Sequence, residues 1–241
     1  MEEEQREAIV QALQHKVLVI TGGPGTGKTT LLNSLLTLLR ASKVSFALAA
    51  PTGRAAKRMG EMAGEEARTI HRLLEYSPRE RRFQRGENNP IDADVVIIDE
   101  ASMVDLPLMD HLLRAVEPHS HLILLGDVDQ LPSVGPGSIL RDLIESGTVP
   151  VVVLRRIFRQ SRESLIIVNA HRILQGQPLL FGNDQEKRDF VFVARENEEE
   201  ILGEVKTLIK DGLRVQGFQG SRDSQLFNPS TLQPFDRVQV L

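Results

Sequence analysis

The sequence predicts an α/β fold in which helices cover both faces of a mainly parallel sheet. Short apolar runs alternate along the chain with longer segments of helical periodicity. Most of these runs are continuously apolar, which is typical of strands covered on both sides. Because strands and helices alternate, we expect parallel pairing through right-handed crossovers. The expected strands are 17–20, 44–49, 95–98, 122–125, 149–153 and 190–194.

Helices are expected between these strands, and two segments break the alternation. Residues 76–89 are polar and rich in arginine, which predicts an exposed loop or a small hairpin inserted into the domain. Residues 212–235 are rich in Gly, Ser, Gln and Asn, which predicts a linker or irregular segment. Residues 236–241 then resemble a single strand. The expected helices are 3–14, 28–40, 54–63, 106–116, 138–145, 161–174 and 198–210.

Composition narrows the class of protein. The 241 residues suffice for one large or two small domains, and 41% of them are hydrophobic. A net charge of −4 argues against a uniformly basic nucleic-acid binder, although local patches can still bind phosphate. The absence of cysteine excludes disulfides, thiolate zinc sites and cysteine nucleophiles. No apolar run reaches the ~20 residues that span a bilayer, and the acidic start is unlike a signal peptide, so we expect a cytoplasmic protein.

A glycine-rich segment directly after the first expected strand predicts a phosphate-binding loop. It has the pattern G-x-x-x-x-G-K-T in the order strand, turn, helix. Glycines allow the backbone to curl so that its N–H groups and the helix start face an anion. Lys28 can reach the β- and γ-phosphates of a nucleotide, and the Thr29 hydroxyl can hold Mg²⁺. The expected nucleotide-binding residues are Gly22, Gly23, Pro24, Gly25, Thr26, Gly27, Lys28, Thr29 and Thr30.

Two carboxylates follow the expected strand 95–98. At the carboxyl end of a buried strand, Asp99 and Glu100 would lie where α/β sheets bind ligands. Asp99 suits Mg²⁺, which takes one or two carboxylates and keeps several waters. Glu100 would orient and deprotonate the attacking water. The alternative, two solvated acids at a strand end, is weakened by the phosphate loop in the same chain.

Two further strand ends carry polar residues that could act on a γ-phosphate. Gln130 can donate to the phosphate and accept from a water, and the alternative is a polar loop. Three arginines lie in residues 155–159, and one of them could neutralise charge in the transition state, as arginine fingers do. The alternative is a solvated basic turn.

Two helix starts could bind the phosphates of a nucleic acid. Thr52 can cap the helix that follows Pro51, and Arg54, Lys57 and Arg58 lie on neighbouring faces of that helix. Thr69 and His71 form a second polar cluster at an expected helix start. For both, helix capping with solvated side chains is the alternative.

Taken in order, these segments resemble the RecD-like branch of the superfamily 1 DNA helicases. The resemblance covers about residues 3–200 through the motifs GGPGTGKTT, APTGRAAKRM, TIHRLL, VVIIDEASMVDLPLM, LILLGDVDQLPSVGPG, LRRIFRQ and SLIIVNAHRILQGQ. It implies a RecA-like P-loop NTPase fold and an ATP-driven motor that moves 5′ to 3′ on single-stranded DNA in repair or recombination. In such enzymes two RecA-like domains enclose ATP.

The resemblance also implies roles for individual residues. Gln5 would read the adenine, and Arg159 would belong to the motif at the hinge toward the second domain. The matching catalytic residues are Lys28, Glu100, Gln130 and Arg159, with Thr29 and Asp99 at the metal. The matching DNA-binding residues are Pro51, Thr52, Arg54, Thr69 and His71. The insert near 76–90 resembles a strand-separating pin.

The expected organisation is a first motor domain over 1–211, a linker over 212–235 and the start of a second motor domain at 236–241. Such a chain should bind nucleotide but should not unwind DNA alone. Two other classes stay open: a different P-loop ATPase, such as a small-molecule kinase or an assembly ATPase, and a non-catalytic nucleotide- or DNA-binding module.

Overall fold

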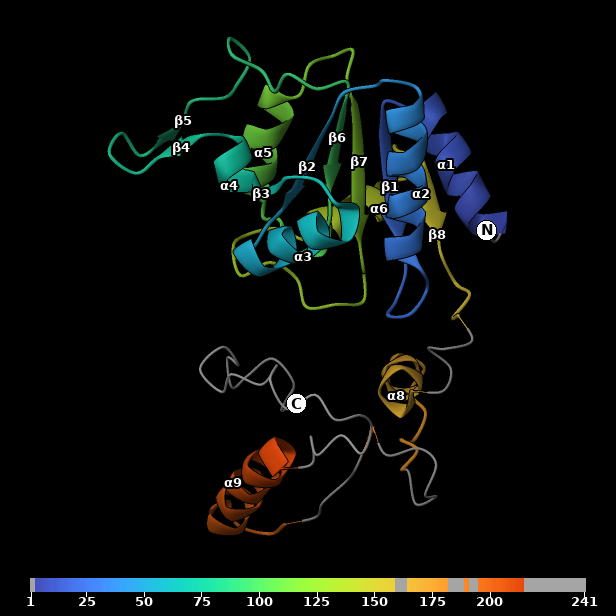
Figure 1. Cartoon of the computed structure of the whole chain (residues 1–241), viewed down its shortest axis with the longest axis vertical. Coiled ribbons are helices and arrows are strands. Elements are labelled where there is room, and N and C mark those ends of the chain that lie inside the picture. Colours follow the sequence, from blue (N-terminus) through green and yellow to red (C-terminus); the bar gives the residue numbers. More distant parts are fainter. Residues whose placement is uncertain (1–2, 159–163, 182–188, 191–194, 215–241) are drawn as a thin grey trace, which may run out of the picture. The chain divides into compact units, whose positions relative to one another are not determined.

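A computed structural model describes residues 3–158, 164–181, 189–190 and 195–214. It divides into two compact units, Met1–Phe190 and Val191–Leu241. The sheet and the helices packed on it belong to the first unit (Figure 1). In the second unit, α9 spans Glu198–Arg214.

The main sheet has the strand order β3-β2-β6-β7-β1-β8, and every described pair in it is parallel. This confirms the predicted α/β fold with a mainly parallel sheet. The register sets Thr21, the last residue of β1, beside Gly126 and Val153. The strands are β1 (Val17–Thr21), β2 (Phe46–Ala50), β3 (Ala67–Thr69), β6 (Val95–Ile98), β7 (His121–Gly126) and β8 (Val151–Val153).

Helices pack on both faces of this sheet because its strands carry apolar side chains on both. On β1, Leu18 and Ile20 join one core cluster, whereas Val19 belongs to the other. The first cluster packs beneath α1, α2 and α3, and the second beneath α4, α5 and α6. The helices described in this unit are α1 (Glu3–Gln14), α2 (Lys28–Ala41), α3 (Gly53–Ala63), α4 (Ile70–Leu73), α5 (Leu106–Ala115), α6 (Ile139–Ser146) and α8 (Leu165–Leu174), with a 3₁₀ turn at Ala101–Met103.

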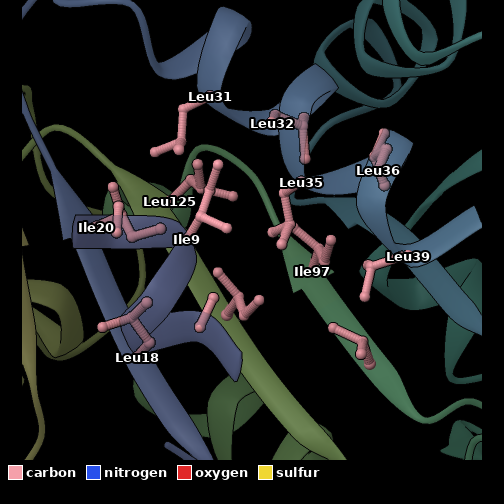
Figure 2. Close-up of a cluster of buried hydrophobic side chains, with 14 of the residues drawn as sticks. Ile9, Leu18, Ile20, Leu31, Leu32, Leu35, Leu36, Leu39, Ile97 and Leu125 are labelled. Carbon is pink, nitrogen blue, oxygen red and sulfur yellow. The ribbon is translucent and has the colours of Figure 1, made fainter. Parts of the chain in front are cut away.

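Leucines of α2 fill the centre of the first cluster. Five of them recur at helical spacing along one side of α2, are nearly inaccessible to solvent and face β1, β6 and β7 (Figure 2). Since α2 begins at Lys28, this packing also fixes the end of the glycine loop. The five residues are Leu31, Leu32, Leu35, Leu36 and Leu39.

Several predicted boundaries need correction. The strand expected from residue 44 begins at Phe46, because Ser45 is engaged with the Asp94 side chain through its own N–H and hydroxyl. The predicted helix 161–174 is described from Leu165, with Ser164 as its N-cap. Residues 161–163 lie outside the described chain. Phe190 is not in a strand, and the rest of the predicted strand 190–194 lies outside the described residues.

Strand β3 was not predicted, whereas the insert near residues 76–89 forms a hairpin. Residues Ala67–Thr69 have no apolar run, yet they pair with β2 from Leu48 to Ala50. The insert forms an antiparallel hairpin of β4 (Tyr76–Ser77) and β5 (Arg82–Phe83), in agreement with one of its two predicted forms.

The predicted irregular segment 212–235 begins too early. Helix α9 continues to Arg214, because one glycine at position 212 weakens a helix without ending it. Residues 215–241, including the expected second-domain strand 236–241, lie outside the described chain. The two compact units divide between residues 190 and 191, and a first motor domain over 1–211 stays a prediction. Within the described residues, no helix is both long and apolar enough to cross a bilayer.

Replacing Leu36 by Ala should lower the free energy of unfolding by about 2–5 kcal/mol, since it opens a cavity in a fully buried part of the core. Leu38→Ala on the same helix is the control, because Leu38 is 42% exposed, and it should cost about 0.5 kcal/mol. Chemical denaturation measures both. Equal losses would contradict the described orientation of α2.

Candidate nucleotide-binding site

The site lies at the carboxyl ends of the parallel strands. The loop after β1 carries the glycines, β6 leads to Asp99 and Glu100, and β7 leads to the loop of Gln130. These strands are neighbours in the order β6-β7-β1, so the three segments emerge side by side. Residues from all of them line one cavity of about 750 Å³, within the size range of ligand pockets.

Two glycines give the loop its shape. Gly25 and Gly27 have φ angles of 74° and 85°, a region that side chains disfavour. A Cβ on Gly27 would lie 2.2 Å from the Phe158 ring and 2.7 Å from the Gln5 amide. The Thr26 hydroxyl donates to the carbonyl oxygen of Gly23 at 2.8 Å and braces the turn from within.

The Lys28 ammonium group lies inside this loop. It donates to the carbonyl oxygen of Gly22 and, at 3.2 Å, to that of Gly23. Lys28 and its neighbours Thr29 and Thr30 line the cavity, and α2 starts at Lys28. The positive end of a helix and a lysine therefore face the same space, which favours an anion there.

Asp99 and Glu100 also line the cavity, and their carboxylates bring negative charge to a lining that contains the positively charged Lys28. Burial raises the pKa of Asp99, and the Glu100 N–H, which donates to it at 2.9 Å, opposes the rise. Burial and the charge of Asp99 raise the pKa of Glu100. Lys28 and Arg58 lower the pKa of both groups. Glu100 has a φ of 53°, so its backbone turns sharply after the strand.

Gln130 lies on the exposed rim of the same cavity. Its loop is held to the glycine side of the sheet, because the Val128 N–H donates to the Thr21 hydroxyl at 3.2 Å. Arg159, the other residue expected near the γ-phosphate, lies outside the described residues.

Gln5, the residue expected to read the adenine, packs against the glycine loop. It is 2% exposed, and its amide donates to the carbonyl oxygen of Gly27 at 3.3 Å. It supports the loop from below and, in the described structure, is not part of the cavity lining. Adenine recognition by Gln5 stays a prediction.

The expected DNA-binding residues separate into two groups. Thr52 and Arg54 line the nucleotide cavity, and Thr52 caps α3 by accepting from the Ala55 N–H at 3.2 Å. Thr69 caps α4 by accepting from the Arg72 N–H at 3.2 Å. Ala50 and Thr69 are partners across β2 and β3, so Pro51 and the two helix starts share one edge.

His71 belongs to the hairpin side of that edge. Its ring packs against Tyr76, with centroids 5.9 Å apart, and against Phe83, at 5.6 Å. Phe83 also contacts His111 of α5, at 4.5 Å. The hairpin is therefore fastened to the domain by aromatic contacts.

Sequence reasoning missed two residues that touch the loop. The Phe158 N–H donates to the carbonyl oxygen of Gly25 at 3.0 Å, and its ring lines the cavity. His171 of α8 places Nε2 3.1 Å from the carbonyl oxygen of Pro24. The position of Phe158 before Arg159 was the available signal for the first, whereas nothing local indicated the second.

Gly27→Ala should abolish nucleotide binding, because the Phe158 ring and the Gln5 amide would both have to move while φ stayed strained. Gly64→Ala is the matched control: its φ is 65°, but nothing lies within 4 Å of the added Cβ. Gly64→Ala should lose about 1–2 kcal/mol of stability because of its strained φ alone, and Gly27→Ala should lose more because of the added clashes. Titration with a fluorescent ADP separates them, and similar affinities in the two variants would refute the described loop.

Comparison with known proteins agrees with this geometry. An AAA domain family model, AAA_19, matches residues 5–136. The chain is 39% identical over 183 residues to the ATP-dependent RecD2 DNA helicase of Deinococcus radiodurans, covering 76% of this chain and 25% of the relative. It is 45% identical over 167 residues to the RecBCD enzyme subunit RecD of Mycolicibacterium smegmatis, covering 59% of this chain and 30% of the relative.

A solved structure supports the fold. The Pif1 helicase from Candida albicans matches with a TM-score of 0.54 and 24% identity, covering 89% of this chain and 55% of that one. The fold is thus that of the RecA-like P-loop proteins.

The chain spans about a quarter to a third of the length of the two curated relatives. It belongs to the AAA domain family AAA_19 and, within it, to the RecD-like branch of the superfamily 1 helicases.

Proposed function

We propose that this chain is the ATP-binding and ATP-hydrolysing motor domain of a DNA helicase that acts on single-stranded DNA. One observation carries the proposal: a single cavity brings together the glycine loop, Lys28, the acid pair and Gln130 from neighbouring strand ends. A kinase or an assembly ATPase could share the loop. The similarity to named DNA helicases over 76% of this chain favours the motor.

The chain's own groups would bind the triphosphate. The loop N–H groups and the start of α2 would take the phosphate oxygens. The Lys28 ammonium would exchange its hydrogen bonds to the carbonyls of Gly22 and Gly23 for hydrogen bonds to the phosphates. The phosphates are stronger acceptors because they are charged. Gln5 would contact the adenine if its amide turned away from Gly27.

The donors present fit Mg²⁺. Thr29 and Asp99 offer a hydroxyl and a carboxylate in the cavity, the hard oxygen ligands that Mg²⁺ takes beside nucleotide phosphates. When bound there, the ion would offset the negative charge of the triphosphate.

Three residues would act on the reaction itself. Glu100 would accept a proton from the attacking water as general base. Gln130, on the rim, would hold that water or the γ-phosphate. Arg159 would neutralise the charge that develops on the phosphate oxygens. As part of the motif at the hinge, it would also couple the bound nucleotide to the second motor domain.

DNA would lie along the edge formed by Pro51, Thr52, Arg54, Thr69 and His71. We infer movement from 5′ to 3′, work in repair or recombination and a cytoplasmic location by analogy with the RecD-like resemblance. Stepping needs a second RecA-like domain to close on ATP, and 236–241 would begin it. The described domain alone would hydrolyse ATP weakly and would not unwind DNA.

Glu100→Gln should keep ATP affinity within about twofold and lower hydrolysis by 10²–10⁴-fold, because the amide cannot accept the proton. Glu61→Gln is the control, since Glu61 is an exposed acid on α3. Phosphate release with saturating single-stranded DNA, in a protein that contains both motor domains, measures the effect. Normal hydrolysis by Glu100→Gln would reject the assigned base.

Binding of single-stranded DNA to this chain should be weak and salt-sensitive. Contacts to the DNA backbone release counterions, so log K should fall with log[salt] at a slope of about −0.7 for each phosphate contacted. Fluorescence anisotropy with a labelled oligothymidine measures the slope. A flat response would exclude backbone contacts.

A further inference from the structure

One face of α3 forms a wall of the nucleotide cavity. The residues concerned recur at helical spacing, so they project from the same side of the helix. Helix α3 follows β2, which pairs with the strand leading to Asp99. The wall therefore stands one strand away from the acid pair. Its residues are Arg54, Ala55, Arg58, Met59 and Met62.

Arg58 brings a positive charge close to both carboxylates. Its charge lowers the pKa of Asp99 and of Glu100, as Lys28 does. Unlike Lys28, which donates to loop carbonyls, the Arg58 guanidinium forms no hydrogen bond or ion pair with any residue that the structure describes. Its electrostatic attraction to the acid pair thus leaves all of its N–H donors open to a ligand.

The neighbouring Lys57 shows that this placement is specific to one face of α3. Its side chain is 80% exposed and lies 3.8 Å from Glu61, one turn further along the helix. Lys57 does not line the cavity in the described structure. Both side chains are exposed to solvent, but only that of Arg58 lines the nucleotide cavity in the described structure.

The charged residues of the cavity lining favour a further contact to an anionic ligand. Its lining holds three cations, Lys28, Arg54 and Arg58, against the two carboxylates Asp99 and Glu100. A triphosphate is strongly negative, and a guanidinium can bind two phosphate oxygens through parallel N–H groups. Desolvation beside the acid pair would strengthen such a contact.

We propose that Arg58 binds the terminal phosphate of ATP from the α3 wall, an inference that rests on the proposed function of this cavity. The loop N–H groups and the start of α2 would hold the inner phosphates. The acid pair would face the terminal phosphate, where the metal and the attacking water are needed. Arg58 lines the same cavity as the acid pair and interacts electrostatically with both carboxylates. We therefore expect its guanidinium to lie near the terminal phosphate. Arg58 would thus distinguish ATP from ADP.

The test compares a nucleotide that has the terminal phosphate with one that lacks it. The affinities of AMPPNP and ADP, each with Mg²⁺, are measured by displacement of a fluorescent ADP from the full chain. Arg58→Met should weaken AMPPNP by about 10- to 100-fold, the loss expected for a charged hydrogen bond, and ADP by no more than about twofold. Arg58→Lys should lose less, because it keeps the charge. Lys57→Met should change neither affinity.

Other outcomes decide against the proposal. Equal weakening of AMPPNP and ADP, or no weakening of either, would overturn it. So would a selective loss of single-stranded DNA affinity with nucleotide affinities unchanged, which would make Arg58 a DNA contact. The thermal midpoint of Arg58→Met shows whether the fold is intact. If the wild-type chain bound neither nucleotide, the proposed function itself would fail.

Discussion

The turn after β1 is the constraint on which the rest of the site depends. Its shape requires Gly25 and Gly27 at positive φ, and residues distant in sequence pack directly on it. The Gln5 amide donates to Gly27, and the Phe158 N–H donates to Gly25. The Glu4 carboxylate accepts from the N–H of Arg155 at 2.9 Å, so α1 holds the same segment. The phosphate loop is thus tied to the chain that leads toward Arg159.

The charges of Lys28 and Arg58 allow the acid pair Asp99 and Glu100 to lie in the same cavity as the glycine loop. Partial burial of Asp99 and Glu100 disfavours their charged forms and raises their pKa values. Lys28 and Arg58 oppose this effect from the loop and from α3. An anionic ligand would draw both cations toward itself, and the cation bound with it would then stabilise the carboxylates. The charge state of the acid pair and the binding of a nucleotide therefore depend on the same two cations, Lys28 and Arg58.

Local patterns in the sequence predicted the elements that build the site. The order of strand, glycine turn and helix is contained in residues 17–40, and β6 with Asp99 and Glu100 is a continuous apolar run followed by two acids. Features that arise from distant pairing were not predictable. Strand β3 exists because Leu48 pairs with Ala67. His171 reaches Pro24 across 147 residues. The charge of Arg58 is evident from the sequence, but which face of α3 lines the cavity is not.

The central claim is that a nucleoside triphosphate lies on the glycine loop with its terminal phosphate toward Asp99 and Glu100. A crystal structure of the chain with Mg²⁺ and AMPPNP tests it most directly. The account predicts phosphate oxygens within hydrogen-bond distance of the loop N–H groups and of the Lys28 ammonium, with the acid pair beside the terminal phosphate. A nucleotide bound elsewhere, or a terminal phosphate that points away from both carboxylates, would contradict it.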